Sequence, residues 1–494
     1  MKSKLYVIDW LLLVLLVVVS NQAVLWLKFL ALLVLILMRP NWRGLFQRQR
    51  LSLFIPLLIL VAAVNFTFFV QEYTLPSITS FGVSIGFWIA AFLGSHQVKI
   101  SVERNPQKIL PTLQLFTILN LLISFGQVAR IAWQNQVWNP YNDLPFPYGM
   151  STGDLVFGIL GEASYNNAFV SGLLALYFLF KRKWLFFLLC LITELLVFGN
   201  IMLLSLSFLF VLIALAGLVK RLRPHASWLP TKAVALAALA GAALLLVMIR
   251  VVSPENTNYI LAHTVSETAP PADELTEIED PNASKHMHAS LLQQVATLDF
   301  KKYHRPEMPG DRVDVGIRER LTEKAVHELK GKKLSFLETA AYLKSDVRTL
   351  MLGAGPGRFS SLTAARMSGL DSSRLFRKVL PQFSTKAYTE NHRLIHVYRV
   401  SGDPAWLSNA NWPDSFYNQL LGEYGLAGLL LFLVFYVLRY LRRSLHQSYS
   451  IWASALLIPI ALLTYLVEPL CVLFFYELLV ESDNSIGPVK TQIA

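Results

Sequence analysis

Residues 163–223 read ASYNNAFVSGLLALYFLF-KRK-WLFFLLCLITELLVFGN-IMLLSLSFLFVLIALAGLV-KRLR, and this stretch decides the fold class. Its three apolar runs, at 163–180, 184–199 and 201–219, each approach the roughly 20 residues that an α-helix needs to cross a bilayer. A basic loop separates the first two runs, and an uncharged turn at Asn200 separates the second and third. Such alternation is typical of consecutive membrane-spanning helices.

The same pattern extends over most of the chain and predicts an all-α integral membrane protein with about twelve transmembrane helices. Met1–Lys4 is basic and precedes an apolar run, as in a signal peptide. No small-residue cleavage site separates this run from the next, so we expect two short helices and a turn. The predicted spans are 5–20, 22–38, 51–70, 78–98, 109–131, 163–180, 184–199, 201–219, 233–252, 414–438, 450–467 and 469–481.

The charges between the spans predict their orientation. Every second connection lacks Lys and Arg, whereas the connections between them are basic. Basic loops stay in the cytoplasm, so we expect both termini there and the loops without Lys or Arg outside. The set without Lys or Arg comprises the Asn21 turn, residues 71–77, residues 132–162, the Asn200 turn and the Glu468-Pro469 turn.

Composition excludes several classes of protein. The net charge of +12 lies in short loops between apolar runs, so topology explains it and we expect no nucleic-acid partner. Both cysteines, Cys190 and Cys471, lie in apolar runs, which excludes a disulfide framework. There is no Walker loop, and the spacing of His286 and His288 is more often incidental than metal-binding. We therefore expect no cofactor and no metal site.

Three domains are predicted: a membrane domain of about nine spans at 1–252, a large external domain at 253–412, and a C-terminal membrane domain of two or three spans at 413–494. In the external domain, residues 266–284 are rich in Pro and acids and predict a flexible loop. Residues 312–350 have helical periodicity.

Two ionisable residues stand out within the spans. Glu194 is a candidate substrate contact, because an intramembrane charge is expensive, although a role in helix packing explains it equally well. Lys28 is long enough to reach the membrane surface with its amine, and we expect it to do so.

The external domain is rich in arginine, whose planar fork suits phosphate. Arg358 follows Gly353-Ala-Gly-Pro-Gly357, and we expect it to open a helix. Free backbone N–H groups at a helix start favour an anion, so Gly355 and Gly357 are candidate binding residues as well. The further candidates at the outer face are Arg318, Arg320, Arg366, Arg130 and Arg250.

A second group of residues lies at Trp412–Gly428, which reads WPDSFYNQLLGEYGLAG and leads directly into an apolar span. Asp414 and Ser415 are placed to cap this helix. The same position puts the Asp414 carboxylate at the membrane surface, where a lipid head group lies.

These two groups resemble the bacterial O-antigen polymerase and O-antigen ligase superfamily of membrane glycosyltransferases. Asp414-Ser415, nine residues and then Gly425-Leu-Ala-Gly428 match a family motif, and Arg358 to Leu362 match its Arg-x-x-x-Leu pattern. Arg318 or Arg320 resembles a further arginine of the family. One departure is Asp414, where ligases usually have His. Another is Leu203–Phe210, which lacks the family's Ser-Arg pair.

The resemblance implies a GT-C-like fold in the bacterial inner membrane, with the large loop in the periplasm. The implied reaction is metal-independent and inverting, and its donor is a glycan on undecaprenyl diphosphate. Arg358 first, and Arg318 or Arg320 second, would stabilise the departing diphosphate. Asp414 would act as a base or orient the acceptor, with Glu390 and His392 as lesser candidates. The implied substrate contacts are Gly355, Gly357, Arg366, Arg250, Arg130, Ser415 and Glu194.

We therefore expect a polymerase that joins lipid-linked repeat units into an O-antigen, capsule or exopolysaccharide, together with a flippase and a chain-length regulator as possible partners. The first alternative is an O-antigen ligase, which transfers glycan to lipid A core. A protein-glycosylating transferase of the same superfamily is the next. From a different class, a lipid-glycan transporter or a non-catalytic assembly subunit remains open.

Overall fold

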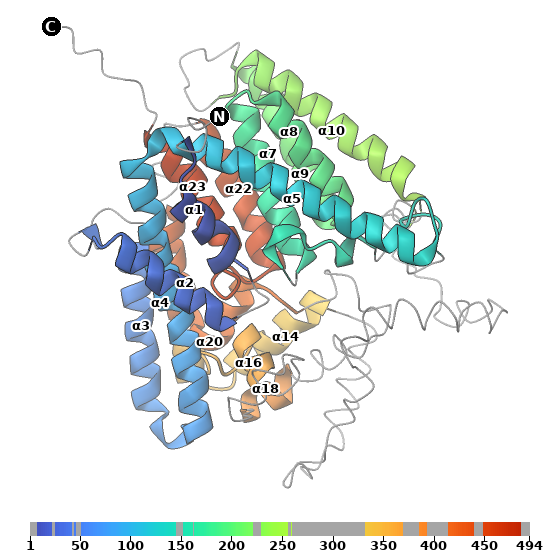
Figure 1. The fold of residues 1–494 in the computed structure, drawn as a ribbon. Coiled ribbons are helices and arrows are strands. Elements are labelled where there is room, and N and C mark those ends of the chain that lie inside the picture. The colour runs from blue at the N-terminus through green and yellow to red at the C-terminus, as the bar shows by residue number, and fades with distance from the viewer. Residues whose placement is uncertain are drawn as a thin grey trace, which may run out of the picture.

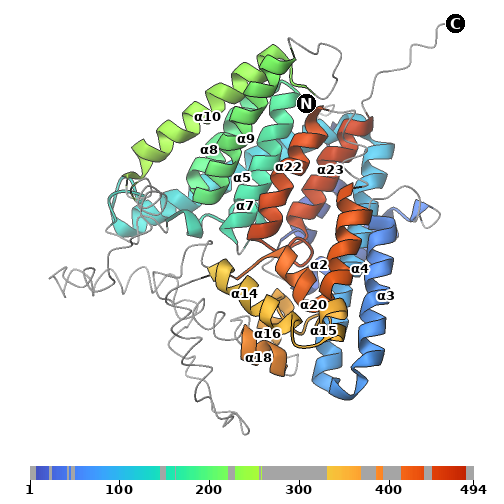
Figure 2. The ribbon, with the colours of Figure 1, turned by 180° about the vertical axis from the view of Figure 1, so that it is seen from behind.

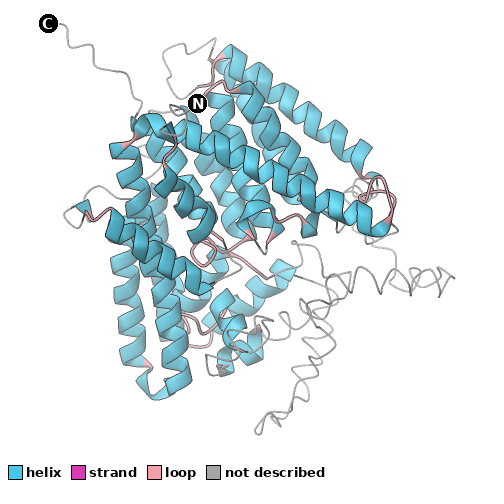
Figure 3. Ribbon diagram, viewed as in Figure 1, coloured by secondary structure: helices cyan, strands magenta, loops and turns pink. Residues whose placement is uncertain are grey.

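The computed structural model of the protein describes residues 7–21, 25–41, 44–45, 51–144, 152–161, 163–220, 229–254, 258, 331–368, 385–392, 413–438 and 448–485. All regular elements within these residues are helices (Figure 3). The expected all-α fold is therefore confirmed for the described part of the chain.

A helix occupies each predicted span before residue 253, because long runs of Leu, Ile, Val, Ala and Phe favour helix and contain few helix-breaking residues. Left-handed residues end two of these helices, Gln136 after α5 and Phe198 after α8. The elements are α1 (Trp10–Val14), η2 (Leu15–Val19), α2 (Leu25–Met38), α3 (Leu51–Phe68), η4 (Val70–Glu72), α4 (Leu75–Arg104), α5 (Pro106–Asn135), η5 (Thr152–Leu155), η6 (Gly158–Leu160), α7 (Ser164–Phe180), α8 (Trp184–Val197), α9 (Asn200–Val219) and α10 (Lys232–Val252).

The described part of the external domain is made of short helices, and longer apolar helices follow it. The helix predicted over 312–350 is seen as α14 and α15, and residues 312–330 lie outside the described residues. The elements are α14 (Gly331–Leu343), α15 (Val347–Leu352), α16 (Leu362–Met367), α18 (Lys386–Asn391), α20 (Phe416–Leu431), η11 (Phe432–Leu438), α22 (Ser448–Leu463) and α23 (Cys471–Ser485).

Five helices in the described residues are long and apolar enough to cross a membrane. They are α4, α5, α9, α10 and α20 with its continuation η11. Several further apolar helices coincide with predicted spans but are shorter, among them α2, α8 and α22. The apolar helices support an α-helical membrane protein, and the number of spans beyond these five stays a prediction.

The helices pack into one assembly with a large apolar core. Figures 1 and 2 show α3 and α4 as a long hairpin at one side and α7, α8, α9 and α10 at the other, with α22 and α23 between them. The short helices α14, α16 and α18 lie together at one end, beside α20 and the hairpin. The described parts of segment 253–412 therefore pack against the apolar helices.

Part of the predicted loop 132–162 packs against the helices. Side chains from neighbouring segments bind the backbone of 156–159: Asn120 Oδ1 accepts from Ile159 N–H at 3.0 Å, and Asn167 Nδ2 donates to the Val156 carbonyl at 3.3 Å. Gln127 Oε1 accepts from Gly158 N–H at 2.9 Å. Irregular backbone is stable at such a site because its polar groups have partners inside the protein.

Candidate functional site

Arg358 lies in an irregular loop, residues 353–361, between α15 and α16. Gly353, Gly355 and Gly357 all have positive φ, at 67°, 94° and 69°, which an L side chain adopts only with strain. The prediction that Arg358 opens a helix is wrong, because α16 begins at Leu362. Ser361 is its cap, and the Ser361 hydroxyl accepts from Ala364 N–H at 3.1 Å.

The loop is bound to α20 through its backbone. Ala354 N–H donates to the Gly422 carbonyl at 2.8 Å, and Gly355 N–H donates to the Glu423 carbonyl at 3.0 Å. Glu423 Oε1 also accepts from Phe359 N–H at 3.3 Å. Gly353 lies so close to α20 that a Cβ on it would meet the Glu423 carbonyl carbon at 2.5 Å.

A second carboxylate, Glu468, binds the start of α16. It lies in the turn between α22 and α23 and accepts from Leu362 N–H at 2.9 Å and Thr363 N–H at 2.7 Å. The predicted backbone cradle for an anion at Gly355, Gly357 and this helix start is therefore wrong, because protein carbonyls and carboxylates take several of its donors. Any anion role in this loop rests on the Arg358 side chain.

Burial raises the pKa of Glu468, while the hydrogen bonds from Thr363 and the charge of Arg366 act to lower it.

Lys28 of α2 binds the turn that carries Glu468. Lys28 Nζ donates to the carbonyls of Glu468 at 3.2 Å and Pro469 at 3.1 Å, and the residue is only 2% exposed. The expectation that Lys28 reaches the membrane surface is thus wrong, because these carbonyls supply a buried partner.

The Arg358 side chain reaches the tip of the α3–α4 hairpin. Its guanidinium carbon lies 4.1 Å from the centre of the Tyr73 ring, and Arg358 is 4% exposed. The Tyr73 hydroxyl donates to Asn65 Oδ1 at 3.0 Å, and Asn65 Nδ2 donates to the Gly353 carbonyl at 2.9 Å. Ser80 of α4 donates to the Gly357 carbonyl at 2.5 Å. Sequence analysis missed Asn65, Tyr73 and Ser80, because nothing near them in sequence marks a contact with residues 353–358.

Two further helices, α14 and α18, contact Arg358 and Phe359. Thr385, the cap of α18, donates to the Arg358 carbonyl at 2.6 Å. The Phe359 ring stacks on Tyr342 of α14 at 4.5 Å and meets the His392 ring edge-on at 4.4 Å. His392 is buried, and its Nε2 lies 3.1 Å from Thr339 Oγ1 of α14. Nothing is described of the Glu390 side chain.

Asp414 and Ser415 lie at the start of α20, under α14. Ser415 is the cap, as predicted, and its hydroxyl accepts from Asn418 N–H at 3.4 Å. Asp414 is 1% exposed, and its carbonyl accepts from Lys332 Nζ of α14 at 2.6 Å. Asp414 is therefore covered by the protein, and its depth in a membrane stays a prediction.

Asn418 connects the two groups of residues found in the sequence. Its carbonyl accepts from the Ser360 hydroxyl of the Arg358 loop at 2.9 Å, and its Nδ2 donates to Ser335 of α14 at 2.6 Å. The Arg358 loop and the Asp414–Ser415 helix start therefore belong to one packed site.

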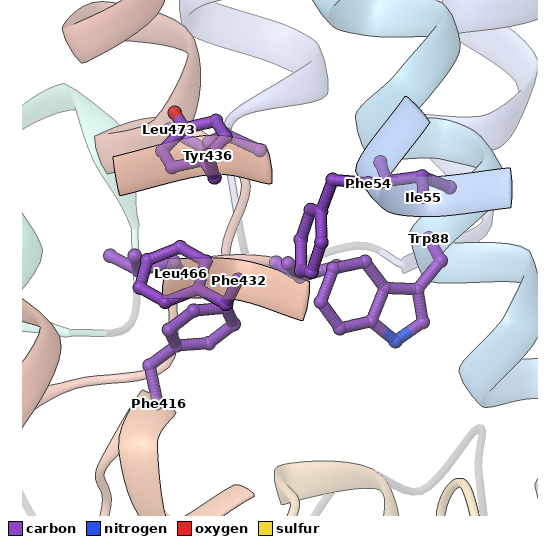
Figure 4. Close-up of a pocket in the computed structure, with 9 residues that line it drawn as sticks. Phe54, Ile55, Trp88, Phe416, Phe432, Tyr436, Leu466 and Leu473 are labelled. Atoms are coloured by element: carbon purple, nitrogen blue, oxygen red, sulfur yellow. The ribbon is translucent and has the colours of Figure 1, made fainter. Parts of the chain in front are cut away.

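An apolar pocket adjoins this site (Figure 4). Aromatic side chains from α3, α4, α20 and η11 line it, and Phe416 directly follows the Asp414–Ser415 pair. Leu466 and Val467, which directly precede Glu468, complete one wall. Polar groups of the site and apolar groups of the pocket thus lie on the same two segments of chain.

The remaining predicted site residues lie elsewhere or are not described. Arg130 and Arg250 are exposed near the ends of α5 and α10, which lie away from α16 and α20 (Figures 1 and 2). Glu194 is fully buried beside Gly172 of α7, and neither of its carboxylate oxygens makes a hydrogen bond to the described residues. Arg318 and Arg320 lie outside the described residues.

Within the described residues, no group of three His, Cys, Asp or Glu side chains is arranged to hold a metal ion. Comparisons with protein-family models, curated proteins and solved structures gave no match.

Proposed function

We propose that the protein is a membrane glycosyltransferase that joins lipid-diphosphate-linked oligosaccharide units into a surface polysaccharide. In this proposal it acts at the periplasmic face of the bacterial inner membrane, without a metal and with inversion at the anomeric carbon. One observation carries the proposal: a buried arginine, Arg358, stacked on Tyr73 beside the end of an apolar helical bundle.

A buried guanidinium is costly to desolvate, so proteins keep it where its charge is used or paired. The guanidinium carbon of Arg358 lies over the Tyr73 ring in a cation–π contact, and the guanidinium donors lie along the edge of that planar group. That geometry suits a diphosphate, which arginine binds through parallel hydrogen bonds. The surrounding loop supplies rigidity, since protein groups bind it on several sides.

In the proposed reaction, an acceptor sugar hydroxyl attacks the anomeric carbon of the donor from the face opposite the diphosphate. A new C–O bond forms, and the bond between the anomeric carbon and the diphosphate oxygen breaks. The bonding electrons leave with the lipid diphosphate, and the hydroxyl proton passes to a base. Arg358 stabilises the charge that develops on the leaving group.

Asp414 is the proposed base or orienting group. Its place at the start of α20 and its covering by α14 keep it close to the Arg358 loop through Asn418.

The proposal is tested by a product assay on the protein in liposomes. Lipid-diphosphate-linked repeat units are supplied with and without a lipid A core acceptor, and the products are resolved by length. Arg358→Ala should lower transfer by about 100- to 1,000-fold, the usual effect of removing one donor to a developing charge. Arg358→Lys should also fail, because it keeps the charge and loses the planar fork. Arg104→Ala, which removes an exposed arginine at the end of α4, is the matched control and should transfer normally.

A ladder of longer lipid-linked glycans supports the polymerase. Glycan found only on the core acceptor replaces this conclusion with an O-antigen ligase. Absence of transfer under both conditions refutes glycosyl transfer and favours a lipid-glycan transporter or an assembly subunit, for which buried Glu194 is the group to examine first.

A further inference from the structure

The outer surface of α3 carries a continuous apolar stripe. Leu53, Leu60 and Phe68 are each at least half exposed, and positions 56, 63 and 67 between them are exposed as well. Steps of three and four residues place these positions on one face of the helix. In an apolar helix of a membrane protein, such a face contacts lipid chains.

The stripe does not stop where α3 ends. Val70, the first residue of η4, and Leu75, the first residue of α4, are 52% and 77% exposed at the tip of the α3–α4 hairpin. Further exposed apolar residues lie on α15, which packs against α3 (Figure 2). Two contacts join these helices: Asn65 Nδ2 donates to the Leu352 carbonyl at 3.2 Å, and the Arg348 guanidinium lies 5.9 Å from the Phe68 ring centre.

The short helix α15 has one exposed apolar face and one buried face. Val347 and Met351 lie four residues apart on one face and are 72% and 43% exposed. On the other side Thr349 is buried, and the Met351 backbone lies against Gly425 of α20. The residues just before α15, Lys344, Ser345 and Asp346, are exposed and polar.

We infer that α15 and the tip of the α3–α4 hairpin lie in the lipid head-group layer, with Val347 and Met351 against the upper lipid chains. Continuity with the lipid-facing stripe of α3 carries this inference, because exposed apolar surface is unfavourable in water. Arg348 fits the same layer, since a long basic side chain covers apolar surface and keeps its charge among head groups. Lys344 and Asp346 then face water.

This placement has a consequence for the candidate site. The loop of Arg358 follows α15 directly and is bound to the same α3 residue, Asn65. Arg358 therefore lies at head-group depth, where any ligand anchored in the membrane presents its polar part. The inference concerns the bilayer as a partner and does not rest on the proposed glycosyl transfer.

Single cysteines carrying a nitroxide label test the inference on the full chain in liposomes. Val347→Cys and Met351→Cys are compared with Lys344→Cys, and Leu60→Cys serves as the lipid-facing reference. The native Cys190 and Cys471 are buried, and the labelled wild type measures their background. Relaxation is measured with oxygen, which concentrates in lipid, and with a water-soluble nickel chelate.

At positions 347 and 351, as at position 60, we expect oxygen to relax the label more strongly than the chelate does, with the reverse at 344. A chelate-dominated signal at 347 and 351 overturns the inference, because α15 then lies in water. Weak relaxation by both agents there also overturns it, because a protein surface then covers the helix. A lipid signature combined with failure of the transfer assay would refute the proposed function alone.

Discussion

The guanidinium of Arg358 lies 4.1 Å from the ring centre of Tyr73, a residue at the tip of the α3–α4 hairpin far away in sequence. The candidate site is thus built from segments far apart in the sequence. The early hairpin provides the surface on which the arginine rests, and late segments provide the loop that carries it.

The ring of Tyr73 should matter more than its hydroxyl. Tyr73→Leu removes the stacking surface, and we expect it to lower transfer by about tenfold, corresponding to the 1–2 kcal/mol of a desolvated cation–π contact. Tyr73→Phe keeps the ring and loses the hydrogen bond to Asn65 Oδ1, so its effect should be several-fold smaller. Steady-state transfer rates of the two variants provide the comparison. Equal losses would assign the role to the hydroxyl.

Glu468 should be important for stability. Glu468→Ala leaves buried donors of Leu362 and Thr363 without an acceptor, and we expect the free energy of unfolding to fall by about 2–4 kcal/mol. Thermal unfolding in detergent measures this, with Glu103→Gln as the control. Glu103 is exposed and pairs only with Lys99 one helical turn earlier, so its loss should cost less than about 0.5 kcal/mol. Similar losses in both variants would contradict the role of Glu468.

Gly425 should not tolerate a side chain. Its φ is +63°, and an added Cβ would meet the Met351 carbonyl carbon at 2.4 Å. Gly425→Ala should therefore displace α15 and lower the unfolding temperature strongly. Gly126→Ala in α5 meets nothing within 4 Å and should be neutral or stabilising by up to about 1 kcal/mol, since Ala favours helix. Unfolding of the two variants by circular dichroism checks the contrast, and an unaffected Gly425→Ala would refute the tight packing.

Asp154, in η5 before α7, should make stability depend on pH. Burial raises its pKa from 3.8 to about 7. Because the folded-state pKa lies above the unfolded value, the stability that protonated Asp154 contributes is fully present below about pH 4. It is lost as pH rises to about 7. The difference in unfolding temperature between Asp154→Asn and the wild type should grow in favour of the variant as pH rises through this window. Above the window the difference should stay constant.

Thermal scans from about pH 4 to 8 measure that difference. Asn142→Gln, which changes an exposed amide in the same segment, is the non-titrating control. A difference between Asp154→Asn and wild type that does not vary with pH would contradict the perturbed carboxyl group.

The positions of the apolar helices could be predicted from sequence because hydropathy is local. Ser415 was recognisable as a cap for the same reason, since its partner is Asn418 in the next turn. The site itself depends on long-range pairs. Glu468 takes the N–H groups at the start of α16, and α20 carbonyls take those of Ala354 and Gly355. Nothing near these acceptors in sequence predicts this.

Arg358 shows both what could be predicted from sequence and what could not. Its residue type and glycine neighbours marked it as a candidate, and the structure buries it at the centre of a packed loop. The predicted helix start was wrong because three left-handed glycines and the Ser361 cap delay the helix to Leu362. The cover over Asp414 could not be predicted, because it comes from α14 through Lys332, far earlier in sequence.

The turn at Glu468 also determines when the contacts of the Arg358 loop can form during biosynthesis. Residues leave the ribosome in order, so the α3–α4 hairpin and the Arg358 loop are made well before α22 is complete. Until residue 468 has been synthesised, the donors at Leu362 and Thr363 have no carboxylate to bind, and Lys28 has no carbonyls at the turn. A nascent chain that stops short of this turn therefore carries an unfinished loop, and maturation of the Arg358 region waits for nearly the last helix to be inserted.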